Sequence, residues 1–136
     1  MDQGGKQYKI IRKDLLYPKL SFLINGVLID VAKTLGGGHR EDYYCKAIET
    51  GFNLKNIKFE REVYTPLKYK EQIVGKYFLD FLIENKIILE IKRGKFVSVS
   101  VIEQTYQYLS AMKLKLALIA CFTYNGVVIK RVINEY

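Results

Sequence analysis

The residues best suited to chemistry lie on two neighbouring predicted strands, over about residues 73–83 and 86–91. If Glu84-Asn85-Lys86 is a three-residue hairpin loop, Asp80 pairs with Glu90, and their Cβ atoms lie about 4.5–5.5 Å apart. Two carboxylates at that distance repel each other unless a proton or a cation lies between them. A hard divalent cation such as Mg²⁺, which prefers oxygen ligands, is the natural partner.

A lysine lies beside this predicted carboxylate pair. Lys92 comes two residues after Glu90, and alternate residues of a strand share one face. Its ammonium group could orient a metal-activated water or stabilise the negative charge that develops on a phosphate. The alternative is a solvated sheet face on which these acids and the lysine form ordinary salt bridges.

Two predicted helices carry further polar candidates. Glu41 comes three residues before Tyr44 and seven before Ile48, which places it on the buried stripe of its helix. A carboxylate there needs a cation or strong hydrogen bonds, although a glutamate at a helix start also favours the positive helix end. Gln104 and Tyr108 share a face of another helix, where they either supply polar groups to a site or simply pack.

The elements that must position these residues follow from apolar periodicity and turn signals. Helices are predicted over about residues 17–35, over residues 39–53, and from a cap at Ser98 or Ser100 to about Met112. Strands are predicted over residues 57–67, 73–83, 86–91, 114–122 and 127–133. This order predicts an α/β fold with a mixed central sheet flanked by helices.

Alternation along the two central strands predicts one wholly apolar face and one mixed face. The apolar face carries Leu79, Phe81, Ile83, Ile87, Leu89 and Ile91. The opposite face carries Phe78, Asp80, Leu82, Ile88, Glu90 and Lys92. The candidate acids and the lysine are therefore expected on the same side of the sheet.

The composition fits one domain over residues 1–136, with a basic N-terminal segment at about residues 1–14. Apolar residues make up 49% of the chain, which excludes a disordered chain and suffices for a core. The longest strongly apolar run, residues 116–122, is too short for a membrane span. No secretory signal is recognised and the two cysteines are expected to be reduced, so the cytoplasm is the expected location.

The charge balance suits a polyanionic partner. Twenty-two basic residues against 14 acidic residues give a net charge of +8, and neutralising phosphates releases counterions. An ordinary basic protein explains the charge equally well. Arg61, which interrupts the apolar side of its strand, and Arg93 are candidates for phosphate contacts, with simple solvation as the alternative for each.

Several short motifs occur in a recognisable order. They are Gly38-x-x-Glu41-x-x-Tyr44, residues 59–63, residues 80–84, residues 87–92 and Gln104-x-x-x-Tyr108. Together they resemble the GxxExxY protein family of the PD-(D/E)XK nuclease superfamily, over about residues 14–133. Two positions depart from the pattern: Leu79 stands where the superfamily has a proline, and Val101 where the family often has a histidine.

The resemblance implies a fold and a site. The superfamily core is a mixed sheet with flanking helices. Asp80 and Glu90 would be metal ligands, Glu41 would complete the metal site, and Lys92 would be the catalytic lysine. The glutamine and tyrosine of the last motif are similar to a pair found in the RecB-like exonuclease branch.

These observations predict a Mg²⁺-dependent nuclease, in which Mn²⁺ is expected to substitute. The expected substrate is nucleic acid, with DNA favoured over RNA, and no membrane is involved. Candidate substrate-binding residues are Gln104, Tyr108, Arg61 and Arg93. A chain of this size covers little of a duplex, which favours a homodimer. The alternatives are a non-catalytic nucleic-acid-binding or regulatory module on a nuclease fold, and a purely structural interaction domain.

Overall fold

The computed structural model describes residues 16–134, so the predicted basic segment at about residues 1–14 lies outside the described residues. The elements in chain order are α2 (Pro18–Leu35), α3 (Glu41–Leu54), β1 (Phe59–Tyr69), β2 (Gln72–Ile83), β3 (Ile87–Arg93), α4 (Val99–Met112), β4 (Leu116–Thr123) and β5 (Gly126–Ile133). Each lies within about two residues of its predicted position, because periodicity and turn residues are local signals.

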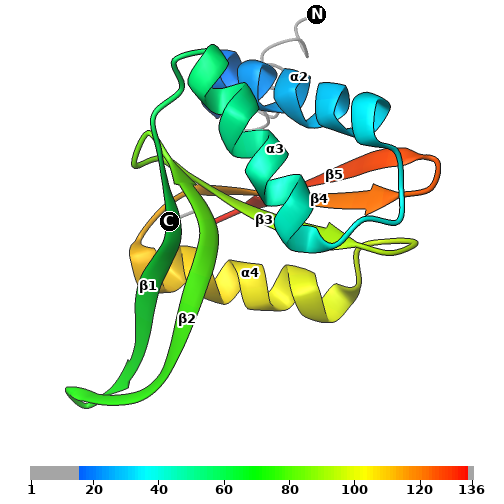
Figure 1. Ribbon diagram of the computed structural model, residues 1–136. Helices are drawn as coiled ribbons and strands as arrows, with labels where there is room; N and C mark the ends of the chain where they lie inside the picture. Colours follow the sequence, from blue (N-terminus) through cyan, green and yellow to red (C-terminus); the bar gives the residue numbers. More distant parts are fainter. Residues whose placement is uncertain (1–15, 135–136) are drawn as a thin grey trace, which may run out of the picture.

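The strands form one mixed sheet in the order β1-β2-β3-β4-β5. β3 and β4 are parallel and are connected through α4, whereas the other neighbouring strands are antiparallel. Figure 1 shows α2 and α3 on one face of the sheet and α4 on the other. The predicted mixed sheet flanked by helices is therefore confirmed.

Apolar side chains fill both layers between the helices and the sheet. Ile48 and Phe52 of α3 belong to the cluster on one face, and Leu109 of α4 belongs to the cluster on the other. The hydroxyl of Ser98 accepts the backbone N–H of Val101 at 3.3 Å, so Ser98 is the cap of α4. Within residues 16–134, no helix is both long enough and apolar enough to cross a membrane.

The alternation of side chains along β2 changes phase next to Asp80. Phe81 and Ile83 lie in the cluster beneath α2 and α3, whereas Leu79 lies in the cluster beneath α4. The prediction that Leu79 shares one apolar face with Phe81 is therefore wrong. Glu62 of β1, opposite Asp80, has a left-handed φ of 52°, and this residue pair is missing from the β1–β2 pairing. A left-handed residue interrupts the pleat, which explains the change of face.

Beyond this point β1 and β2 continue as a two-stranded hairpin that extends past α4 (Figure 1). We call residues 64–78 the β-arm. One face of the β-arm rests on α4: the Thr65 hydroxyl donates to Met112 Sδ at 3.5 Å, and the Tyr77 and Tyr108 rings lie 4.7 Å apart. The helix therefore supports the base of the β-arm and leaves its other face uncovered.

Candidate active site

The strand pair β2–β3 opens at Asp80 and Glu90, and the two carboxylates bridge the opening. Backbone pairing between these strands ends at Phe81 and Leu89. The backbone N–H of Asp80 instead donates to Glu90 Oε2 at 2.9 Å, and the backbone N–H of Ile91 donates to Asp80 Oδ2 at 2.8 Å. The two acids thus face each other, as the register predicted, and their side chains replace backbone hydrogen bonds of the ladder.

Both carboxylates occupy a poorly solvated position. Glu90 is only 5% exposed, and its burial, followed by the charge of Asp80, raises its pKa to about 8. Burial also raises the pKa of Asp80, against the opposing effects of the Ile91 N–H and the Lys92 charge. A buried pair of this kind favours a proton or a cation between its oxygens at neutral pH.

Lys92 lies close to both acids. It is a half-buried residue of β3, and its positive charge lowers the pKa of both Asp80 and Glu90. One ammonium group therefore lies within electrostatic range of two hard oxygen donors where the sheet opens. Such a set can hold a divalent cation and orient a phosphate beside it.

Glu41 approaches the pair from the first turn of α3, and its charge raises the pKa of Glu90. The prediction that Glu41 lies on the buried stripe is wrong, because as the first residue of α3 it is exposed, whereas Tyr44 and Ile48 are buried. Among residues 16–134, no group of three or more histidine, cysteine or acidic side chains gathers closely enough to hold a metal ion. The structure therefore brings Asp80 and Glu90 together and places Glu41 within electrostatic range of Glu90.

The turn before α3 gives a physical reason for the glycine–glutamate–tyrosine motif. The Tyr44 hydroxyl donates to the carbonyl of Gly36 at 2.6 Å and accepts the backbone N–H of His39 at 3.3 Å. The Tyr44 ring stacks on Phe122 with 4.1 Å between centroids. The buried tyrosine thus fixes the turn from which Glu41 begins the helix.

Arg61 is engaged by three groups of the protein. Its guanidinium forms an ion pair with Glu49 of α3 and lies 4.7 Å from the centre of the Phe81 ring. Its Nε donates to the backbone carbonyl of Asp80 at 2.7 Å. The sequence suggested a phosphate contact, but these contacts favour a positioning role, in which Arg61 ties α3 to the strand that carries Asp80.

The remaining candidates differ in exposure. Tyr108 is 6% exposed, and burial, followed by the charge of Glu90, raises its pKa to about 12, so it is a neutral hydroxyl near the carboxylates. Gln104, one turn earlier on α4, is exposed. Arg93 is also exposed, and its Nη1 donates to the carbonyl of His39 at 3.3 Å, which links β3 to the turn before α3.

One side of α3 carries a stripe that was not predicted, formed by Glu41, Cys45 and Glu49. These residues are four positions apart, a spacing that places them on one side of a helix. Cys45 is buried, and burial followed by the charge of Asp80 raises its pKa to about 12. The spacing, combined with the unexplained Arg61, was the available signal that this side of α3 faces the acids.

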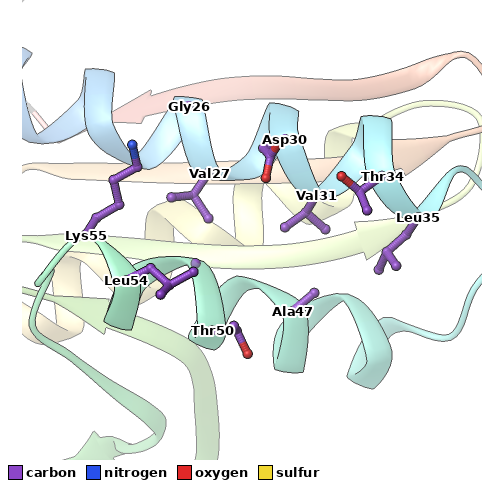
Figure 2. A pocket seen from close by; sticks show the side chains of 11 residues that line it. Gly26, Val27, Asp30, Val31, Thr34, Leu35, Ala47, Thr50, Leu54 and Lys55 are labelled. Atoms are coloured by element: carbon purple, nitrogen blue, oxygen red, sulfur yellow. The ribbon is translucent and has the colours of Figure 1, made fainter.

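A hollow of about 680 Å³ lies elsewhere, between α2 and α3 (Figure 2). Much of its wall is apolar, as at Val27, Val31 and Leu54, and Asp30 and Lys55 also line it. It includes none of the candidate residues. The candidate site is therefore defined by the facing carboxylates and not by this hollow.

Comparison with known proteins points to one superfamily. A family model described as the PD-(D/E)XK nuclease superfamily matches residues 18–132, which contain all the candidate residues. A solved structure described as "Crystal structure of SSO0001" shares the fold, with 16% identity and a TM-score of 0.56 over 70% of this chain and 50% of that chain. The chain thus spans about half the length of that protein. Among curated proteins the chain has no match.

Proposed function

Because the chain belongs to the PD-(D/E)XK nuclease superfamily, we propose that it is a Mg²⁺-dependent nuclease that hydrolyses phosphodiester bonds, with DNA favoured over RNA. The observation that carries this proposal is the facing pair of Asp80 and Glu90 at the opening between β2 and β3, with Lys92 beside it. The glycine–glutamate–tyrosine motif that spans the start of α3 supports placement among the GxxExxY proteins.

The donor set fits a hard divalent cation. Asp80 and Glu90 offer carboxylate oxygens, and a cation between them relieves the repulsion of two buried negative charges. We assign Glu41 as the third acid of the metal site. When bound, Mg²⁺ polarises the scissile phosphate and lowers the pKa of the attacking water, and Mn²⁺ is expected to substitute.

The chain's own groups supply the remaining chemistry. Lys92 is assigned to hold the attacking water or a phosphate oxygen, so that its ammonium offsets the negative charge that grows during P–O bond cleavage. Tyr108, a neutral hydroxyl near Glu90, is assigned as a hydrogen-bond donor to substrate. Gln104 and Arg93, both exposed, are assigned to substrate contacts outside the acid pair.

The test is cleavage of end-labelled DNA and RNA, as duplexes, single strands, flaps and junctions, in Mg²⁺ or Mn²⁺. The parent is compared with Glu90→Gln, which keeps an oxygen that can accept the Asp80 N–H, and with Lys92→Ala. Glu60→Gln and Lys130→Ala are matched controls, because both change exposed residues whose side chains form no hydrogen bond or ion pair with the acids within residues 16–134. Circular dichroism and thermal melting confirm that every variant is folded.

Loss of cleavage by about 100-fold or more in both site variants, with full activity in both controls, is the expected result. Cleavage that survives Glu90→Gln and Lys92→Ala would remove the assigned roles. Salt-sensitive binding of nucleic acid without cleavage of any substrate would replace the nuclease with the non-catalytic binding module.

A further inference from the structure

The β-arm exposes an unusual amount of apolar surface. Its large apolar side chains that are more than one third exposed are Tyr64, Leu67, Tyr69, Ile73, Val74 and Phe78. A two-stranded hairpin gains little stability by itself in water, and contiguous exposed apolar surface commonly marks a binding site. The β-arm is therefore a candidate binding element.

The exposed residues at the base of the β-arm lie on the face opposite α4. Thr65 and Tyr77 contact α4, so their neighbours Tyr64 and Phe78 point to the other side. Tyr64 and Phe78 are cross-strand partners, with ring centroids 5.7 Å apart, and are 46% and 54% exposed. They form one aromatic pair that no helix covers, which we call the open aromatic pair.

The open aromatic pair lies next to the candidate active site. Phe78 comes two residues before Asp80 on β2, and Tyr64 comes two residues after Glu62, which lies opposite Asp80. The alternation changes phase at Asp80, so the proximity of Phe78 to Asp80 follows from their separation of two residues along β2. A strand of nucleic acid that leaves Asp80 along the open face of the β-arm would meet the aromatic rings first.

The charge of the β-arm favours a polyanion over a second copy of the chain. The β-arm contains three lysines, Lys68, Lys70 and Lys76, and one acid, Glu71. Lys76 is the cross-strand partner of Pro66 and shares the open face with Phe78. Two such arms packed together would bring like charges into contact, whereas phosphates would neutralise them.

We propose that the β-arm binds single-stranded nucleic acid that leads into the carboxylate pair, an inference that rests on the proposed nuclease function. Tyr64 and Phe78 stack on bases, which are accessible in single strands, and the lysines contact phosphates. From Asp80 to Gln72, where the turn begins, the strand advances eight residues, or about 26 Å. At about 3.4 Å per nucleotide this length matches about eight nucleotides on one side of the cleaved bond.

The test measures binding of fluorescein-labelled oligonucleotides by anisotropy in EDTA, where metal-dependent cleavage does not occur. The parent is compared with Tyr64→Ala/Phe78→Ala, whose exposed rings can be removed without opening the core, and thermal melting checks folding. Phe22→Ala is the matched control, because Phe22 is an exposed aromatic residue of α2 with 78% exposure. We expect the double variant to bind single strands about tenfold more weakly and to bind duplex nearly as well as the parent, and the control to match the parent.

A second variant tests the lysines without touching the rings. For Lys68→Ala/Lys76→Ala, the slope of log affinity against log salt for single strands should fall by about 1.4, since each lost phosphate contact removes about 0.7. Lys19→Ala/Lys33→Ala on α2 is the control, with an unchanged slope expected. Affinity of the parent should rise with length up to roughly eight nucleotides beyond those that the site itself occupies.

Two results would overturn the proposal. Unchanged single-strand affinity in both β-arm variants would remove the nucleic-acid role. A parent that sediments as a dimer and an aromatic double variant that sediments as a monomer with parental affinity would assign the β-arm to a second copy. These results are separable from failure of the proposed function, because a parent that binds through the β-arm but cleaves nothing would refute only the nuclease.

Discussion

In the absence of metal, the parent should become less stable as pH rises. Replacing Glu90 with glutamine should remove this pH dependence. The folded protein holds the pKa of Glu90 at about 8, because the side chain is buried and faces Asp80. In the unfolded chain the same carboxyl titrates near its ordinary value of 4.5. Between these values the folded state binds more protons than the unfolded state, so stability present at pH 4.5 is lost by pH 8.

The size of the effect follows from the difference between the two pKa values. At about 1.4 kcal/mol per pH unit, a pKa of Glu90 raised from 4.5 to about 8 corresponds to a loss on the order of 3–4 kcal/mol between pH 5 and pH 8. This is a large part of the roughly 5–15 kcal/mol that stabilises a typical domain. For a chain of 136 residues it should lower the melting temperature by on the order of 10–15 °C.

The assay is thermal unfolding in EDTA at half-unit steps from pH 5 to pH 8. Apart from its partner Asp80, whose pKa is also raised, few groups change charge in this range, because the chain has a single histidine. Glutamine has nearly the same shape and can still accept the Asp80 N–H, but it carries no charge. The Glu90→Gln variant should therefore hold its melting temperature, whereas the exposed control Glu60→Gln should follow the parent. Added Mn²⁺ should restore the parent at pH 8 and leave Glu90→Gln unchanged.

The general reduction of positive charge on a chain of +8 would stabilise it as pH rises, which is the opposite sign. A parent whose melting temperature is flat or rises from pH 5 to pH 8 in EDTA would refute the assignment of a buried, repelling carboxylate pair. If the melting temperatures of the parent and of Glu90→Gln changed equally with pH, the pH dependence would arise from groups other than Glu90.

Four further variants, two at supports of the site and two where α2 faces α3, are measured as free energies of unfolding in urea. Arg61→Ala should cost about 1–3 kcal/mol by leaving Glu49 without its partner, and a loss no larger than that of an exposed lysine-to-alanine change would contradict this. Tyr44→Phe should cost about 1 kcal/mol by removing the hydroxyl that holds the turn before α3, and unchanged stability would show that the ring alone suffices. Gly26→Ala should stabilise α2 by about 0.5–1 kcal/mol, because a Cβ there meets nothing within 4 Å. Gly51→Ala should instead destabilise by about 1–3 kcal/mol, because its Cβ would lie 2.6 Å from a valine of α2; the same sign in both variants would refute this contrast.

The positions of the elements could be predicted because their signals are local. Pro18 in the first turn of α2, Ser98 before α4 and the hairpin at Asn125 and Gly126 each act within a few residues. The facing of Asp80 and Glu90 also followed from a local feature, the loop length of one hairpin.

What could not be predicted depends on neighbours distant in the chain or on backbone angles. A glutamate does not by itself indicate a left-handed φ, so the conformation of Glu62 could not be predicted. The change in side-chain alternation that puts Leu79 and Phe81 on opposite faces of the sheet was therefore not predicted either. Arg61 was visible as an interruption of the pattern, but its partner Glu49 lies on another element. Periodicity placed Glu41 on the buried stripe, and only the position of the helix start reveals its exposure.

The hydrogen bonds across the opening between β2 and β3 bear on how this site can change in evolution. Asp80 and Glu90 each accept a backbone N–H of the facing strand, so each acid also fastens two strands that no longer pair through their backbones. A relative that had lost catalysis would still be under selection to keep both acids, or their amide equivalents, because their side chains hydrogen-bond β2 to β3. Lys92 makes no such backbone hydrogen bond among the described residues. In a family of such chains, the lysine is therefore the residue whose loss would first distinguish an inactive descendant from a working nuclease.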